Sequence, residues 1–235
     1  MSTFSRILRF FSKRAPASRG FTLIELLVVS VIIVLITAFV LFRQEGFNSS
    51  TLLRSLSYSV ALSMRQAQVY GVSVRESAAG SGVFAQGYGV YFGNSGLVDS
   101  THYLLFADAN GNGQYAAGEE LPRYTIGNGR GTDYLIKAFC ARQSGTDKCW
   151  TSATGDTDDI TSLTVYFRRP NPDACFATSA QTGACATATT PAVYDYAYVQ
   201  LKSFTGTDYR TIKINSTGQI SVCKPALDSA GIAAC

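Results

Sequence analysis

The sequence predicts an α+β fold in which a long N-terminal helix packs on an antiparallel β-sheet domain. Three observations lead to this prediction. An apolar run fills residues 21–42, an amphipathic pattern continues it, and the rest of the chain consists of short β-branched and aromatic runs divided by Gly, Ser, Asn and Asp. We therefore expect a basic leader over residues 1–20, a helix over residues 21–71 and a β-rich domain over residues 72–235.

The charge of the chain is uneven along its length. The 20 Lys and Arg residues outnumber the 16 Asp and Glu residues, but residues 1–20 contain five of the basic side chains and no acidic one. Residues 21–235 therefore keep 15 basic against 16 acidic side chains. A basic tail before an apolar run is typical of a segment oriented at a membrane, so we do not expect nucleic acid as a partner.

The apolar run is long enough to cross a bilayer. Its 22 residues from Phe21 to Phe42 would span about 33 Å as a helix, and only Thr22, Glu25, Ser30 and Thr37 interrupt its apolar character. A secretory signal would end in a small-residue cleavage site, and no such site follows. The candidate cleavage point lies before the run, which would leave the apolar helix attached to the mature protein.

The stretch GFTLIELLVVSVIIVLI, which starts at Gly20, resembles the class III signal of type IV pilins and type II secretion pseudopilins. The resemblance implies that a membrane prepilin peptidase cleaves between Gly20 and Phe21. It also implies that the new N-terminus, Phe21, is methylated. In the mature chain Glu25 would be the fifth residue, where the family carries its glutamate.

The resemblance also implies a role for Glu25. A lone carboxylate in hydrocarbon costs a few kcal/mol and normally marks a partner. We expect Glu25 to pair with the free amine of Phe21 on a neighbouring subunit during assembly, which would set the register of two helices. The alternative is that Glu25 pairs with the Phe21 amine of its own chain and only eases residence in the membrane.

The helical pattern continues beyond the apolar run. Apolar residues recur at three- and four-residue spacing from Leu53 to Ala67, which predicts a helix face that packs on the sheet. Gly71 is a plausible terminator. The segment Gln44–Ser50 contains Gly46 and an Asn-Ser run, so we expect a bend or local melting there.

The remaining chain predicts hairpins of short strands. The expected strands are residues 72–77, 87–92, 102–107, 121–126, 134–139, 162–167, 196–203, 210–215 and 219–223. The Pro-, Ala- and Thr-rich residues 168–192 are interpreted as an exposed loop. Over residues 21–125 the helix, its continuation SLSYSVALSMRQAQVYGVSVRES and the run GYGVYF resemble the H-type minor pseudopilins and related minor type IV pilins.

Six cysteines lie in the second half of the chain, and none forms a CxxC pattern. An even number behind an export-like N-terminus indicates disulfides in an oxidising compartment. Fifteen pairings are possible, and the spacing favours sequence neighbours. The expected disulfides are Cys140–Cys149, Cys175–Cys185 and Cys223–Cys235.

The stretch DANGNGQYAAGE (residues 108–119) fits the spacing of a calcium-binding loop. The expected oxygen donors are the side chains of Asp108, Asn110, Asn112 and Glu119 and the backbone carbonyl of Gln114. Only two of these ligands are charged, so we expect structural calcium of weak affinity, about 10⁻⁴ M. The alternative is a metal-free hairpin tip, because Asn-Gly pairs form good turns.

Taken with the resemblance, these features predict a structural subunit, not an enzyme. His102 is the only histidine and has no obvious second ligand. The leading hypothesis is a minor pseudopilin or minor pilin of a type IV filament, with a single pass through the bacterial inner membrane and a periplasmic or extracellular C-terminal domain. Its expected partners are other pilin or pseudopilin subunits, prepilin peptidase and an inner-membrane assembly platform. The alternatives are a minor pilin for adhesion or DNA uptake and a non-polymerising, membrane-anchored calcium-binding module.

Overall fold

The computed structural model describes most of residues 20–235 and none of residues 1–19. For residues 43–48 only the backbone is described. The chain forms two compact units, Met1–Glu45 and Gly46–Cys235. The described residues are 20–73, 75–76, 80, 82, 84–85, 87–94, 96, 98–126, 134–152, 159–181, 185, 194–203 and 206–224.

A single long helix, α1, runs from Leu23 to Val72 over 50 residues, close to the expected residues 21–71. Its backbone stays helical through Gln44–Ser50, so the expected local melting is not observed. One glycine costs about 1 kcal/mol relative to alanine in a helix, and an uninterrupted hydrogen-bonded ladder on both sides offsets this cost.

Gly71 lies inside the last turn of α1 and does not terminate it. The glycine is buried, and a Cβ atom at this position would lie 2.6 Å from the backbone oxygen of Phe167. The sequence requires glycine here because the helix passes very close to strand β6 (Ser162–Arg168), which contains Phe167. Gly71 was expected to end the helix as a C-terminal cap, but the glycine is needed for the close contact with Phe167.

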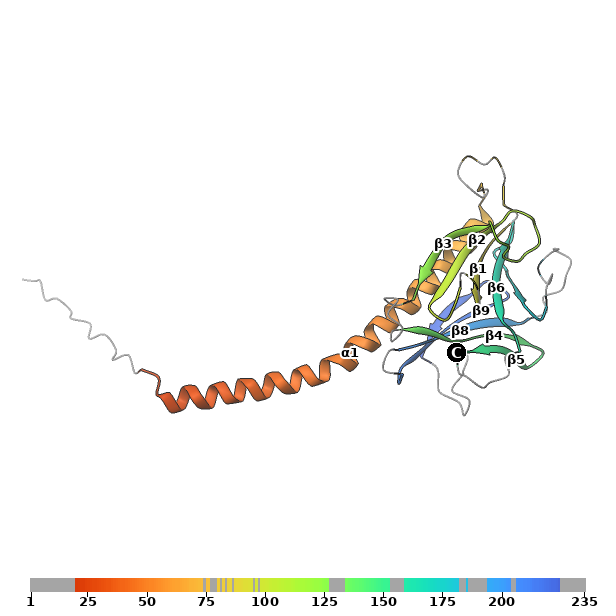
Figure 1. Ribbon diagram of the computed structural model, residues 1–235. Coiled ribbons are helices and arrows are strands. Elements are labelled where there is room, and N and C mark those ends of the chain that lie inside the picture. Colours follow the sequence, from red (N-terminus) through yellow and green to blue (C-terminus); the bar gives the residue numbers. More distant parts are fainter. Residues whose placement is uncertain are drawn as a thin grey trace, which may run out of the picture. The chain divides into compact units, whose positions relative to one another are not determined.

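Ten strands follow the helix in the described part of the chain, and all pair antiparallel in two five-stranded sheets. The strand order is β3-β2-β1-β6-β7 in the first sheet and β10-β9-β8-β4-β5 in the second (Figure 1). The strands are β1 (Gly87–Gly93), β2 (His102–Asp108), β3 (Glu120–Thr125), β4 (Leu135–Gln143), β5 (Thr146–Thr151), β6 (Ser162–Arg168), β7 (Ala174–Thr178), β8 (Tyr196–Lys202), β9 (Tyr209–Asn215) and β10 (Ile220–Cys223).

One core joins both sheets and the second part of α1. The helix contributes Leu53, Val60, Met64 and Ala67, all at most 1% exposed, and they cluster with apolar side chains from both sheets. The predicted helix face is thus the buried one, and the expected α+β arrangement is confirmed. Smaller clusters lie outside this core, one containing Phe106 and Tyr166 and another containing Cys140 and Tyr198.

Two strands were not predicted, and one predicted strand does not form among its described residues. Strand β7 lies within residues 168–192, which were expected to be loop, and β5 was missed because TDKCWT is mostly polar. Both are edge strands. Of residues 72–77, Val72 still belongs to α1 and Glu76 forms only an isolated bridge with Phe84.

Candidate functional site

The expected cleavage and assembly residues lie at the start of α1. Gly20 and Phe21 precede the helix, and both are exposed. The Glu25 amide donates to Thr22 Oγ1 at 3.3 Å, and the Thr22 hydroxyl donates to Glu25 Oε2 at 3.4 Å. Thr22 is therefore the N-cap residue of α1, and Glu25 supports this cap as well as placing negative charge at the positive end of the helix.

This capping role of Thr22 was missed from the sequence. The signal was present, because a threonine three residues before a glutamate and directly before an apolar run is the pattern of a capping box. Glu25 is exposed at the helix surface. Its carboxylate therefore caps its own helix and is open to a second partner.

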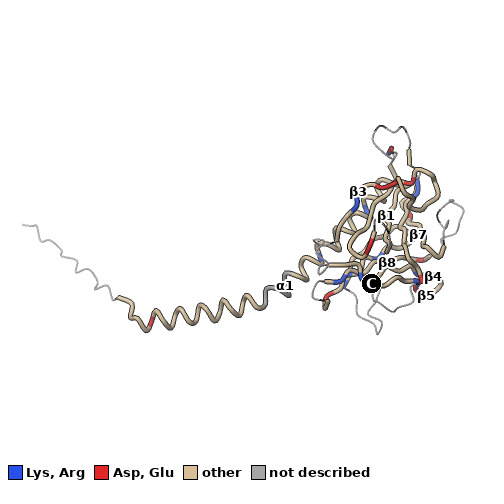
Figure 2. Tube along the Cα trace, in the orientation of Figure 1, with Lys and Arg blue, Asp and Glu red and all other residues tan. Residues whose placement is uncertain are grey.

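The segment Leu23–Phe42 is long and apolar enough to cross a membrane. Its mean hydropathy is 3.0, and none of it is buried against the rest of the chain. Figure 2 shows how few charged positions this part of α1 carries. The Ser30 and Thr37 hydroxyls donate to the carbonyls of Leu27 and Ile33, at 2.8 and 2.7 Å. Both hydroxyls thus donate their hydrogen bonds to carbonyls of the same helix. A polar group in lipid or in a bundle of helices needs such a partner.

The second part of α1 exposes an apolar stripe on the side away from the core. We call Tyr58, Leu62, Val69 and Val72 the outer stripe; they are 51, 69, 57 and 47% exposed. Two hollows of about 420 and 430 Å³ flank it, one lined partly by Ile220 and Val222 of β10 and the other partly by Pro172. Contiguous exposed apolar surface of this kind marks a protein–protein or membrane contact.

The expected calcium loop connects β2 to β3 and folds around its own carboxylates. Asp108 is fully buried. Its Oδ1 accepts from the amides of Gly111 and Asn112 at 2.7 and 3.2 Å, and its Oδ2 accepts from Gly113 at 2.9 Å. Since a buried carboxylate needs such bonds, Asp108 organises this loop with or without a metal ion.

The other expected ligands also hold the loop. Asn110 Oδ1 accepts from the Asn112 amide at 2.9 Å, and Asn112 Oδ1 accepts from the Gln114 amide at 2.8 Å. Glu119 Oε1 accepts from the amides of Ala109 and Asn110 at 3.0 and 3.2 Å, which closes the loop from its far end.

The donor types in this loop fit calcium, and only two of them are charged. Oxygen ligands of this kind are the ones that calcium prefers. Within the described residues no group of three or more His, Cys, Asp or Glu side chains forms a metal cluster. Calcium in this loop therefore stays a prediction.

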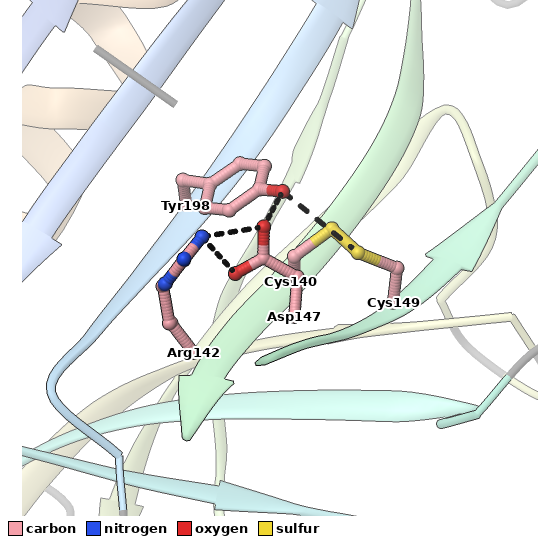
Figure 3. The surroundings of a disulfide bond; sticks show 5 residues. All are labelled: Cys140, Arg142, Asp147, Cys149 and Tyr198. Carbon is pink, nitrogen blue, oxygen red and sulfur yellow. Dashed lines mark hydrogen bonds and ion pairs between the residues drawn. A yellow bond between two sulfur atoms is a disulfide. The ribbon is translucent and has the colours of Figure 1, made fainter. Parts of the chain in front are cut away.

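The Cys140–Cys149 disulfide joins strands β4 and β5, where the two residues lie directly opposite in the register. Figure 3 shows its surroundings. The Tyr198 hydroxyl donates to Asp147 Oδ2 at 3.1 Å and lies 3.9 Å from Cys149 Sγ. Arg142 Nη1 lies 3.2 Å from Asp147 Oδ1. The disulfide and this polar group hold edge strand β5 to the sheet.

The second expected disulfide, Cys175–Cys185, is also present. It ties edge strand β7 to Cys185, which is buried and belongs to the Phe106 cluster. A Cβ atom on Gly113 of the expected calcium loop (the calcium-type loop, residues 108–119) would lie 2.5 Å from the Cys185 carbonyl oxygen, so Cys185 packs on this loop. Cys223 is disulfide-bonded as well. Its expected partner, Cys235, lies outside the described residues.

His102 serves the start of β2. Its Nδ1 lies 2.8 Å from Asp99 Oδ1, and the same oxygen accepts from the amide and the hydroxyl of Thr101 at 2.8 and 2.7 Å. Burial alone would raise the pKa of Asp99, but the bonds from His102 and Thr101 outweigh it and lower the pKa to about 2. The arrangement fixes the turn before β2.

Comparison with known proteins adds one observation at the N-terminus. Residues 16–41 match the prokaryotic N-terminal methylation motif. The motif spans the expected cleavage point, Glu25 and most of the exposed apolar part of α1, and it supports a type IV pilin-like subunit. No curated protein and no solved structure matches the chain. For a pilin-like chain the motif implies processing by prepilin peptidase and assembly with other pilin subunits in the membrane.

Proposed function

We propose that the chain is a minor pseudopilin or minor pilin, a low-copy structural subunit of a type IV filament system such as type II secretion. The methylation motif over residues 16–41 carries this proposal. After cleavage between Gly20 and Phe21, the apolar part of α1 stays in the inner membrane as a single pass. It then moves into a filament, with the β-rich domain on the periplasmic or extracellular side.

Two features of α1 support assembly. The segment Leu23–Phe42 is exposed, and its Ser30 and Thr37 hydroxyls bond to carbonyls of the same helix. Such a helix can leave lipid and pack against the apolar helices of neighbouring subunits. The outer stripe adds apolar surface on the second part of the helix, where a second subunit would cover it. The resemblance to H-type minor pseudopilins over residues 21–125 favours a minor subunit of type II secretion.

Processing tests the proposal directly. The full-length chain is expressed with and without prepilin peptidase, and its N-terminus is determined by sequencing and mass spectrometry. We expect Phe21 carrying one methyl group when the peptidase is present, and Met1 when it is absent. Exported protein that keeps Met1, or that lacks residues 21–42, contradicts the proposal.

Assembly tests the role of Glu25. Glu25→Ala removes the carboxylate, whereas Thr22→Ala removes the N-cap hydroxyl and leaves the carboxylate in place. We expect both variants to insert in the membrane and only Glu25→Ala to be lost from sheared filaments. Equal incorporation of Glu25→Ala and wild type contradicts intermolecular pairing, and equal loss of both variants assigns Glu25 to capping alone.

The competing function is a membrane-anchored binding module that never polymerises. Crosslinking in cells separates the two functions, because a filament subunit is recovered with other pilin-like subunits. Within the filament systems, loss of secreted substrates on deletion assigns the chain to type II secretion. Loss of surface pili, adhesion or DNA uptake assigns it to a pilus instead.

A further inference from the structure

Strand β10 forms one edge of the second sheet, and among the described residues it pairs only with β9. The Asn215 amide of β9 donates to the carbonyl of Gln219 at 3.0 Å, and bonded pairs alternate along an antiparallel ladder. By the register, Ser221 is therefore bonded to β9. The backbone N–H and C=O groups of Ile220 and Val222 point the other way, to the outer edge.

The other three sheet edges are protected in ways that β10 is not. Edge strand β3 has the sequence ELPRYT, with a proline and two charged residues, and β5 has the sequence TDKCWT, also with two charged residues. Edge strand β7 is tied down by the Cys175–Cys185 disulfide. Strand β10 has the sequence ISVC, without proline or charge. Since charges and proline are the usual means of blocking an exposed edge, β10 is the edge that is suited to accept a further strand.

An apolar hollow of about 420 Å³ lies beside this edge, between β10 and α1. Ile220 and Val222 line it from the strand, and Tyr58 and Leu62 of the outer stripe line it from the helix. Ile220 and Val222 pack only partly against the core. The hollow therefore offers further apolar contact directly beside the outward backbone groups of β10.

The geometry of an antiparallel pair fixes the pattern of any strand added here. A residue that bonds to the backbone of Ile220 or Val222 has its side chain on the same face as theirs, over the hollow. The residues between point to the opposite face, which is exposed at Ser221. An added strand should therefore alternate apolar side chains toward the hollow with polar side chains toward solvent.

Arg65 adds a positive charge to the lining of the same hollow. It is exposed, and its Nη1 donates to Gln68 Oε1 at 2.5 Å. Among the described residues no carboxylate forms an ion pair with it. A guanidinium has five N–H donors, so Arg65 keeps the capacity to bind an acidic side chain of an added strand.

We propose that the β10 edge and this hollow bind an extended segment of another protein as an additional strand. Backbone hydrogen bonds to Ile220 and Val222 hold the segment. Its alternate apolar side chains fill the hollow against Tyr58 and Leu62, and an acidic side chain lies beside Arg65. The proposal does not depend on whether the chain assembles into a filament.

The test uses the mature full chain in a lipid nanodisc and two synthetic heptapeptides. One peptide is Thr-Leu-Ser-Val-Thr-Glu-Thr and the other is its reverse, so that the acidic side chain can reach either end of the hollow. Binding is measured by fluorescence polarisation, and we expect at least one peptide to bind. No binding of either peptide at about 1 mM overturns the proposal.

Methylation of the peptide backbone tests strand pairing. N-methyl groups on the Leu and Val of the peptide block the N–H groups that face β10, and we expect them to weaken binding at least tenfold. N-methyl groups on the intervening Ser and Thr block N–H groups that face away from β10 and should leave binding unchanged. Equal effects of the two modifications overturn the proposal.

Variants of β10 locate the binding on the protein. Val222→Pro removes an outward N–H and leaves the bonds to β9, since an edge strand accepts proline at such a position. Val222→Thr keeps the N–H and a similar side-chain shape. We expect only Val222→Pro to lose binding at least tenfold, and thermal unfolding confirms that both variants are folded. Equal binding by Val222→Pro and wild type overturns the proposal.

A charge reversal tests the contact with Arg65. Arg65→Glu should bind the peptide at least tenfold more weakly, and replacing the Glu of the peptide by Lys should restore binding. Lys213→Glu is the control, because Lys213 lies opposite Ser221 in the register and therefore on the other face of the sheet. It should bind like wild type. Binding that ignores both charges at position 65 overturns the proposed site.

Amide hydrogen exchange identifies any other occupant of the edge. In the chain without peptide the amides of Ile220 and Val222 should exchange quickly, and bound peptide should protect them. Protection without peptide at every protein concentration shows that residues of the same chain cover the edge. Protection that appears only at high protein concentration assigns the edge to a second copy of the chain. Either result overturns the proposal.

Discussion

Gly113 lies so close to Cys185 that a Cβ atom on this glycine would be 2.5 Å from the Cys185 carbonyl oxygen. The backbone of the calcium-type loop is therefore packed against the backbone of Cys185, which the disulfide with Cys175 holds. Gly113 also has a φ of +72°, so two separate constraints require glycine at this position. The loop that carries Gln114 depends on this contact for its place beside the sheet.

This contact predicts a large effect for Gly113→Ala. A left-handed backbone costs a residue with a Cβ atom about 1–2 kcal/mol, and forcing the added carbon against Cys185 costs about 1–3 kcal/mol more. The matched control is Gly118→Ala, where φ is +96° but a Cβ atom would meet nothing within 4 Å. Urea unfolding should show Gly113→Ala as clearly the less stable variant. Equal stability of the two variants would show that the loop can move away from Cys185.

Calcium should stabilise the chain if the loop binds it. A ligand at a hundredfold excess over its Kd raises the free energy of unfolding by about 2.7 kcal/mol. We expect calcium to raise the melting temperature, a chelator to reverse the increase and magnesium to have little effect. Glu119→Gln should abolish the increment, because it removes one of the two charged ligands.

Asp108→Ala is a poor test of the same site. Asp108 holds the three loop amides of Gly111, Asn112 and Gly113, so its removal should destabilise the chain even without calcium. The calcium-dependent change in melting temperature is thus the quantity to compare between variants. If neither calcium nor a chelator changes the melting temperature, the loop does not bind calcium.

The sequence predicted the elements whose pattern is strong and local. The 3.6-residue spacing of Leu53, Val60 and Met64 predicted the buried face of α1, because a helix must bury one side to pack on a sheet. The alternating or continuous apolar runs of β1, β2 and β6 predicted strands for the same reason. Neighbouring cysteines predicted two disulfides that the structure contains.

The features that sequence reasoning missed depend on contacts between distant segments. Strand β7 reads as Ala- and Thr-rich loop, yet it pairs with β6 and is tied by Cys175. The hollow between α1 and β10 is lined by residues that are far apart in the chain, and no local pattern indicates that these segments meet. Gly71 was interpreted as a helix end. The reason for glycine at this position is the close contact with Phe167, which is also non-local.

The helix–sheet contact predicts a loss of stability at high pH. The Tyr103 hydroxyl lies 3.0 Å from Ser63 Oγ on α1, and burial raises the pKa of Tyr103 from 10.0 to about 12. The pKa of Tyr103 is higher in the folded chain than in the unfolded chain. The protonated hydroxyl therefore contributes fully to the free energy of unfolding below pH 10, and this contribution is lost as pH rises from 10 through 12. The decrease should reach roughly 2–3 kcal/mol.

Urea unfolding between pH 9 and 12 measures this decrease. Tyr103→Phe should flatten the decline, although it also costs about 1 kcal/mol at neutral pH because the bond to Ser63 is lost. Tyr58→Phe, on the exposed face of α1, is the control and should follow wild type. If Tyr103→Phe and wild type decline with the same slope, Tyr103 does not keep its proton on folding.

The outer stripe predicts a variant that separates assembly from folding. Leu62 is 69% exposed, so Leu62→Glu should change the free energy of unfolding by no more than about 0.5 kcal/mol. In a filament the same carboxylate would be buried without a partner against a neighbouring subunit, which costs several kcal/mol. We therefore expect Leu62→Glu to be processed and inserted normally but strongly depleted from sheared filaments.

Ser59→Glu adds the same charge at an exposed position beside the stripe and should assemble. Normal incorporation of Leu62→Glu would show that the outer stripe faces solvent in the assembled state, and that α1 makes its subunit contacts through Leu23–Phe42 alone.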